Sequence, residues 1–287
     1  MEISRVKIEA DLFFILIKIL KKTKNRKFLR HVVFSLIYYL SFNHRISLGN
    51  IKMAFPGKNR KEVKELNKKS FFTALNHFVD FLNAEKINKE NLDDHFTIKN
   101  YHYLESAFKK GNGAIITSAH FGNFLITGLY SPFIFKGKKV YDVIDVDCSP
   151  KLRKKMINLL SLNGLNLIGR EDWKKCYDVL KNNDVFILVA DPAIGNRAVT
   201  KVNFFNKKIS YPIGPALVGY KSKAQIIPTF TVSKGSKYEV IFEKPLKVDY
   251  SKGLEYNIKN TTQQWANLLE KYIRNYPEQY FWRLRFR

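Results

Sequence analysis

The sequence predicts an α/β protein with a largely parallel, mixed sheet flanked by helices, and with a helical, membrane-associating section at its N-terminus. Continuous apolar runs typical of buried strands recur from residue 113 onwards. Segments with apolar residues three and four positions apart, typical of helices, lie between these runs. Hydrophobic residues make up 45% of the 287 residues, which suits a globular chain with a substantial core. Strands that alternate with helices favour a parallel sheet covered on both faces.

The elements are expected in a definite order along the chain. The pattern predicts helices at 59–86, 150–162, 171–182, 212–223 and 259–275. It predicts strands at 113–119, 138–146, 166–169, 184–191, 202–205, 224–232 and 237–246. No internal repeat or low-complexity linker interrupts this order, so we expect one α/β domain over residues 59–287.

Residues 1–58 are expected to form the separate helical section. Its two apolar blocks, 12–20 and 32–42, are each shorter than the roughly 20 residues that a spanning helix needs. Seven Lys and Arg residues lie between Lys18 and Arg30. Short apolar blocks beside a basic cluster suit a helix in the interface of an anionic leaflet, whereas two core helices joined by a charged turn are the alternative.

The charge balance points to an anionic partner. Fifty Lys and Arg residues stand against 25 Asp and Glu, which gives a formal net charge of +25. A membrane surface, an acidic carrier protein and a nucleic acid all fit such a charge, but no recognised nucleic-acid-binding motif is present, so we expect no nucleic acid. Cys148 and Cys176 lack metal-binding spacing and are expected to be reduced, structural thiols.

The segment TSAHFGNFLITG, residues 117–128, places a histidine directly after one of the predicted buried strands. Asp191 follows the apolar run DVFILVA in the same way. The carboxyl ends of parallel strands meet at one edge of a sheet, where functional groups gather. A histidine titrates near neutral pH and suits removal of a proton from a hydroxyl group. His120 is therefore the expected general base, with a buried structural histidine as the alternative.

Neighbouring residues have expected roles of their own. Gly122 lets a substrate chain approach closely, and Asn123 either caps the next helix or hydrogen-bonds a substrate. Asp191 is alternatively a turn residue that precedes Pro192. His77, in the helix predicted at 59–86, is expected to pack or to lie on the surface.

Seven segments occur in an order that matches a known family: LGNIKMAFPG, RKEVKELNKKSFFTALNHF, TSAHFGNF, GLNLIGR, ILVADPAIG, VNFFNKKISYPIGPALVGYKSKAQIIPTF and YPEQYFWRLRFR. Together they resemble the lysophospholipid acyltransferase superfamily, and specifically its lipid A biosynthesis (late) acyltransferase branch. The resemblance covers most of the chain. The aromatic tail that ends it is expected either to contact a membrane interface or to pack in the core.

The resemblance implies acyl transfer from an acyl carrier protein or acyl-CoA thioester to a hydroxyl or amine of a lipid. It implies that His120 is the general base and that Arg170 binds a phosphate or carboxylate of the substrate. Pro212 and Gly214 are expected to shape the start of a helix on the substrate side. We expect no cofactor and no metal, and a peripheral or monotopic position on the cytoplasmic face of the inner membrane.

One position departs from the family pattern. A Glu or Asp five residues after the histidine orients its ring in the family, whereas this chain has Leu125 there. Three interpretations remain open. A carboxylate from elsewhere replaces it; the four residues considered are Asp145, Glu171, Asp172 and Asp191. Alternatively, His120 acts alone on an easier acceptor such as an amine, or the protein is catalytically inactive and binds lipid or a partner.

Overall fold

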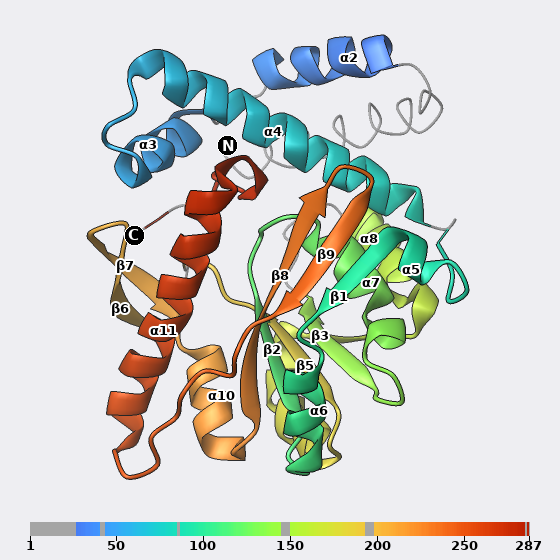
Figure 1. Ribbon diagram of the computed structural model, residues 1–287, viewed down its shortest axis with the longest axis vertical. Helices are drawn as coiled ribbons and strands as arrows, with labels where there is room; N and C mark the ends of the chain where they lie inside the picture. The colour runs from blue at the N-terminus through green and yellow to red at the C-terminus, as the bar shows by residue number, and fades with distance from the viewer. Residues whose placement is uncertain are drawn as a thin grey trace.

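The computed structural model describes residues 27–40, 44–84, 87–144, 150–192, 198–284 and 286 (Figure 1). Its centre is a seven-stranded sheet with the strand order β1-β9-β8-β2-β5-β3-β4. The strands are β1 (Phe96–Lys99), β2 (Ala114–Ser118), β3 (Val140–Ile144), β4 (Asn166–Gly169), β5 (Val185–Val189), β8 (Gln225–Lys234) and β9 (Lys237–Phe242). All neighbouring strands pair in parallel except β8 and β9. The predicted α/β class with a largely parallel, mixed sheet is confirmed.

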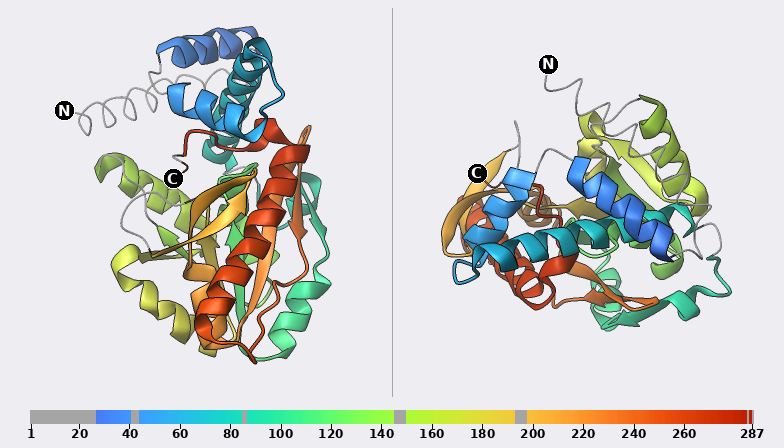
Figure 2. Two further views of the ribbon diagram at one scale, coloured as in Figure 1. Left: turned by 90° about the vertical axis from the view of Figure 1, so that its left-hand side faces the viewer. Right: turned by 90° about the horizontal axis from the view of Figure 1, so that it is seen from above.

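Helices cover both faces of this sheet (Figures 1 and 2). They are α5 (Leu92–His95), α6 (His102–Lys109), α7 (Phe124–Ile134), α8 (Pro150–Leu160), α9 (Cys176–Lys181), α10 (Gly214–Ser222) and α11 (Leu254–Asn275), with the 3₁₀ segments η2 (Ser161–Asn163), η3 (Arg170–Lys175) and η4 (Pro277–Gln279). Successive strand residues point to opposite faces. Accordingly Ile116 joins the apolar cluster beneath α7, whereas its neighbour Ile115 joins the cluster beneath α11. Two covered faces explain why the central strands are continuous apolar runs.

Three helices, α2 (Lys27–Leu40), α3 (His44–Ala54) and α4 (Arg60–Leu82), form a layer at one end of the molecule (Figures 1 and 2). Phe34 and Ile37 of α2 are buried in the cluster beneath α7, and Ile51 of α3 is buried in the cluster beneath α11. None of the helices that the structure describes is long and apolar enough to cross a membrane. The apolar block 12–20 lies outside the described residues, so membrane association and the boundary at residue 58 stay predictions.

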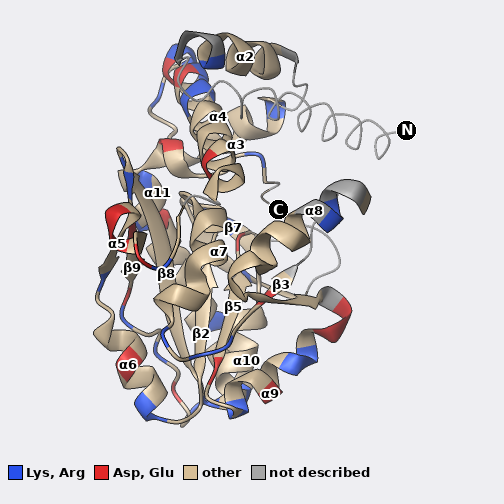
Figure 3. Ribbon diagram, turned by 90° about the vertical axis from the view of Figure 1, so that its right-hand side faces the viewer, with Lys and Arg blue, Asp and Glu red and all other residues tan. Residues whose placement is uncertain are grey.

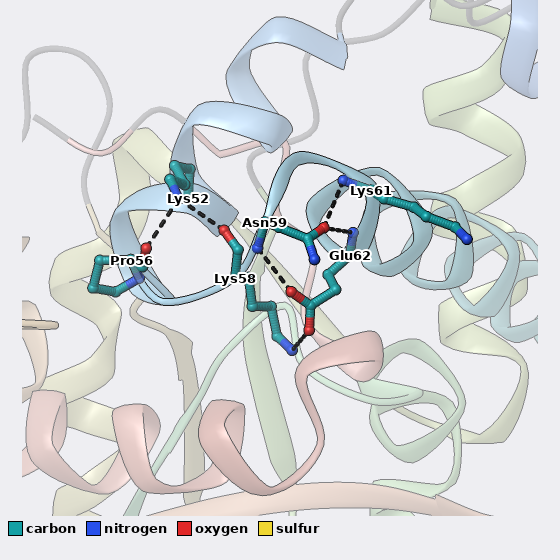
Figure 4. A network of polar contacts seen from close by, with 6 residues as sticks. All are labelled: Lys52, Pro56, Lys58, Asn59, Lys61 and Glu62. Atoms are coloured by element: carbon teal, nitrogen blue, oxygen red, sulfur yellow. Dashed lines mark hydrogen bonds and ion pairs between the residues drawn. The ribbon is translucent and has the colours of Figure 1, made fainter.

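The start of α4 is set by a capping box (Figure 4). The Asn59 side chain accepts hydrogen bonds from the backbone N–H groups of Lys61 and Glu62, at 2.9 and 3.0 Å. The Glu62 carboxylate accepts one from the backbone N–H of Asn59 at 2.7 Å. Lys52 of α3 donates to the carbonyl oxygens of Pro56 and Lys58, at 2.9 and 2.7 Å. These contacts satisfy N–H groups that every helix start leaves open, and they hold α3 against α4.

A separate antiparallel hairpin, β6 (Val199–Phe204) and β7 (Lys207–Pro212), differs from the prediction. Only 202–205 was expected as a strand, and the helix expected at 212–223 begins at Gly214 as α10. Phe205 and Asn206 connect the strands, both with positive φ, as a tight two-residue hairpin turn requires. Strand β1 and helices α5 and α6 were not predicted at all.

Candidate functional site

His120 and Asp191 meet at the carboxyl edge of the sheet. His120 follows β2 and Asp191 follows β5, and these strands are paired neighbours. The Nδ1 atom of His120 lies 2.6 Å from Oδ2 of Asp191, which also accepts the backbone N–H of His120 at 2.9 Å. A carboxylate only accepts hydrogen bonds, so Nδ1 carries the proton and Nε2 keeps its lone pair. The Asp191 side chain is 6% exposed and that of His120 is 38% exposed. The imidazole ring therefore contacts a buried carboxylate on one side and is accessible to solvent on the other.

This contact identifies the carboxylate that faces the ring in place of residue 125. Leu125 is half-buried on α7 and packs against the apolar cluster beneath that helix. Of the other three carboxylates considered, Asp172 pairs with Lys175 at 2.8 Å. Glu171 lies against Gly169, since a Cβ atom built there would stand 2.1 Å from Oε1 of Glu171. Asp145 lies outside the described residues. Among the residues described, Asp191 is therefore the carboxylate bound to His120.

Two aromatic rings flank the open side of the histidine. The ring of Phe124, at the start of α7, is 4.8 Å from the His120 ring between centroids, edge to face. The ring of Phe281 lies 6.1 Å away, and its backbone N–H donates to the His120 carbonyl oxygen at 3.0 Å. Tyr280 and Trp282 are buried, whereas Phe281 is 37% exposed. The C-terminal tail thus packs in the core around the site, which was one of its two expected roles.

The conformation of the turn after His120 is fixed by contacts of Gly122 and Asn123 with other parts of the chain. Gly122 has a φ of +56°, and a Cβ atom there would stand 1.5 Å from the carbonyl oxygen of Thr231. The close approach of β8 therefore requires a glycine, whatever the substrate. Asn123 is buried and caps α7, with its Oδ1 accepting from the backbone N–H of Ile126 at 3.3 Å. Its amide nitrogen donates to the carbonyl oxygen of His77 and to the hydroxyl of Tyr238, at 3.1 and 3.2 Å.

His77 ties this turn to α4. The side chain is buried, and its Nε2 atom lies 2.6 Å from the hydroxyl oxygen of Ser233 in β8. Burial lowers the pKa of His77 to about 4, so the ring is neutral at physiological pH. The packing role expected for His77 is confirmed.

A small cavity lies between α7 and the sheet, and Phe124 beside His120 is one of its lining residues. Its lining residues are Ile116, Ser118, Phe124, Thr127, Gly128, Ser131, Ile134, Phe135, Asp142, Ile187, Val189, Thr229, Thr231 and Val240. Thr127 and Thr231 hydrogen-bond each other at 2.7 Å. The Oδ1 atom of Asp142 is buried and has no hydrogen-bond partner in the described part of the chain. Burial raises the pKa of Asp142 to about 7. Sequence reasoning missed this residue, although a lone charge within the apolar strand VYDVI was a usable signal.

The other predicted site residues are Arg170, Pro212 and Gly214. Arg170 directly follows β4, the edge strand, which lies three places from β2 in the strand order. Pro212 is the buried last residue of β7, so it does not lie in the helix predicted from 212, whereas Gly214 is the first residue of α10. Within the described part of the chain, no contact of Pro212 or Gly214 with His120 is recorded. Across the described ranges, no group of three or more His, Cys, Asp or Glu residues is placed to hold a metal ion.

The geometry can be compared with known proteins. A family model described as bacterial lipid A biosynthesis acyltransferase matches residues 12–287, a range that contains His120, Asp191 and the C-terminal tail. No curated protein matches the chain.

Proposed function

The chain belongs to the bacterial lipid A biosynthesis acyltransferase family, and we propose that it moves an acyl chain from a thioester to a hydroxyl or amine of a lipid. Family membership itself suggests acyl transfer to a lipid. The donor in this proposal is an acyl carrier protein or acyl-CoA. The observation that carries the proposal is the accessible His120 ring, whose Nδ1 atom is bound to a buried carboxylate.

His120 is the general base of this reaction. Its Nε2 atom takes the proton of the acceptor hydroxyl as the oxygen forms a bond to the thioester carbonyl carbon. The carbon–sulfur bond then breaks, and the departing thiolate takes the same proton back from Nε2. The ring returns to its starting state, and the products are an ester and a free thiol.

Asp191 orients the ring and stabilises its imidazolium form during this cycle. The 2.6 Å contact to Nδ1 supports this role, because it leaves Nε2 free to face the acceptor. In the analogous Ser-His-Asp arrangement, an orienting carboxylate is worth roughly 10⁴ in turnover. A second bond from the His120 backbone N–H fixes the carboxylate against β2.

The substrates are proposed to approach from the open side of the ring. The cavity beneath α7 is lined by Phe124, whose ring lies 4.8 Å from the His120 ring between centroids, and its mostly apolar lining suits the acyl chain. Arg170, at the carboxyl end of β4, is proposed to bind an anionic group of the acceptor or donor. The role proposed for Gly122 and Asn123 is to shape the turn that presents His120, in line with their contacts.

Membrane association is proposed to involve α2. Val32, Leu36 and Tyr39 are spaced along one helical stripe and are 37, 56 and 73% exposed. Lys68 of α4 lies over the Tyr39 ring, with its Nζ atom 5.8 Å from the centroid. Apolar side chains beside cations suit the interface of an anionic leaflet.

The basic surface is proposed to serve the donor as well. Lys and Arg occur on helices at both ends of the molecule (Figure 3), which suits an acidic carrier protein as donor. A position on the cytoplasmic face of the inner membrane is part of the proposal.

The test compares the full-length wild type with His120→Ala, using labelled acyl carrier protein and a membrane lipid extract. We expect transfer by the wild type and a fall of roughly 10²–10⁴ in rate for the variant, because a general base is removed. His102→Ala, an exposed histidine on α6, is the matched control and retains the rate. Transfer that survives His120→Ala contradicts the proposed base. Lipid binding without transfer by the wild type favours an inactive, lipid-binding member of the family.

A further inference from the structure

Three buried polar atoms around Asp191 make no hydrogen bond of ordinary geometry within the described ranges. They are Oδ1 of Asp191 and the hydroxyl oxygens of Tyr211 and Tyr280. Tyr211 is 0% exposed and Tyr280 is 1% exposed. A buried polar atom without a hydrogen bond destabilises the folded state, so three of them in one region call for a shared explanation.

Both phenols lie within the electrostatic reach of the same carboxylate. Burial raises the pKa of Tyr211 well above its usual value, and the negative charge of Asp191 raises it further. Burial raises the pKa of Tyr280 in the same way, and so do the charge of Asp191, the neighbouring Tyr211 and a weak hydrogen bond with the Asp191 side chain. Both hydroxyl groups therefore keep their protons at any physiological pH and remain hydrogen-bond donors. Two donors thus accompany one unpaired acceptor oxygen.

We propose that Tyr211 and Tyr280 are positioning residues that donate hydrogen bonds to Oδ1 of Asp191, either directly or through one bridging water molecule. The other oxygen, Oδ2, already holds the His120 ring and backbone. The carboxylate is then held at both oxygens, and its plane is fixed relative to the imidazole. The contribution of this arrangement to turnover rests on the function proposed above.

The two tyrosines are held firmly by elements far apart in the sequence. Tyr211 belongs to β7 and packs against Phe204 of the same hairpin, with ring centroids 5.4 Å apart. Tyr280 belongs to the C-terminal segment, which forms an isolated antiparallel bridge with Phe121. The Ser70 hydroxyl of α4 donates to the carbonyl oxygen of Tyr280 at 2.7 Å. The β6–β7 hairpin and the C-terminal segment therefore position the two tyrosines that are proposed to bind Asp191.

The expected effect on pH dependence has a definite sign. Hydrogen bonds to a carboxylate favour its ionised form, so their removal makes the carboxylate more basic. A more basic Asp191 holds the proton on His120 more tightly. The acidic limb of the kcat/KM profile should therefore move to higher pH when the phenol hydroxyls are removed, and kcat at neutral pH should fall.

The experiment uses the full chain with Tyr211→Phe, Tyr280→Phe and the double variant, all of which keep the buried rings. Tyr272→Phe is the matched control, because Tyr272 is buried in the same apolar cluster and donates to Glu243 at 2.6 Å. We expect about a tenfold lower kcat for each single variant with an unchanged KM, and a shifted acidic limb. The control should show neither change.

A readout independent of turnover separates this proposal from the proposed function. The titration of the His120 imidazole, followed by NMR, should move to higher pH in the two single variants and not in Tyr272→Phe. If the wild type shows no acyl transfer, the proposed function fails, and this titration still tests the proposal. An unchanged His120 titration in the double variant overturns it, even if the variant is less stable or less active.

Discussion

Leu125 shows at the scale of one residue how the site differs from the family pattern. Its side chain packs with the apolar cluster beneath α7, so a carboxylate at this position would lose that packing. We predict that Leu125→Glu gives no gain in transfer rate, because Asp191 already binds Nδ1 of His120. The variant should lower the free energy of unfolding by about 1–3 kcal/mol in denaturant titrations. A large gain in rate would show instead that the orienting carboxylate is missing.

Asp142 makes stability depend on pH. The folded protein holds a proton on this carboxyl group up to about pH 7, whereas the unfolded chain releases it near 3.8. The free energy of unfolding therefore falls as the pH rises from about 4 to about 7. Asp142→Asn removes this loss, so the wild type should lose on the order of 2 kcal/mol more than the variant between pH 5 and pH 8. Parallel pH dependences for the two proteins, measured by urea unfolding, would contradict the assignment.

The pairing of His120 with Asp191 was predictable only in part. The rule that strand ends share one edge placed both residues there. Which of four carboxylates reaches the ring depends on β5 being the neighbour of β2, and that strand order is not readable from local patterns. Tyr211 and Tyr280 were not found because their relation to Asp191 depends on the packing of the hairpin and of the C-terminal segment.

At the scale of elements, α2 carries the clearest exposed apolar stripe. We predict that Leu36→Asp combined with Tyr39→Asp lowers binding to anionic vesicles at least about tenfold in co-sedimentation, because the apolar contact with the lipid interface is removed. Tyr256→Asp is the control, since Tyr256 is similarly exposed, at 49%, on the first turn of α11 at the opposite end of the molecule (Figure 1). Equal losses in the two proteins, or no loss in either, would exclude α2 as the membrane contact.

Whether a helix or strand could be predicted from the sequence depends on how completely its residues are buried. Strands β2, β5 and β8 have helices on both sides, so their long apolar runs identified them. Strand β7 was missed because only some of its residues are buried: Lys207 and Lys208 are exposed, whereas Ile209 and Tyr211 are buried. The edge strand β1 has only four residues, which is too few to show the alternation of apolar and polar residues typical of a strand. The predicted helix at 59–86 was found as α4 because its apolar spacing persists over 23 residues.

At the scale of the whole molecule, the site is assembled from most of the chain. Asn123 in the turn after His120 bonds to His77 of α4, and Gly122 donates to the carbonyl oxygen of Gln279 at 2.8 Å. Helix α4 and the C-terminal segment thus both support the catalytic turn proposed here. Family-like segments extend from 48 to 287, and this arrangement gives a physical reason. A substitution in a segment near either end would disturb residues that contact the turn after His120.

The central claim is that a buried carboxylate from another strand holds the catalytic histidine, and Asp191→Asn tests it most directly. The amide has nearly the same shape as the carboxylate but no negative charge to stabilise an imidazolium ring. The measurement is the single-turnover rate of acyl transfer from labelled acyl carrier protein to membrane lipid, with Asp172→Asn, an exposed surface carboxylate, as the control. The account predicts a fall on the order of 10³–10⁴ for Asp191→Asn and an unchanged rate for the control. A rate for Asp191→Asn within about threefold of the wild type, less than 1 kcal/mol of barrier, would contradict it.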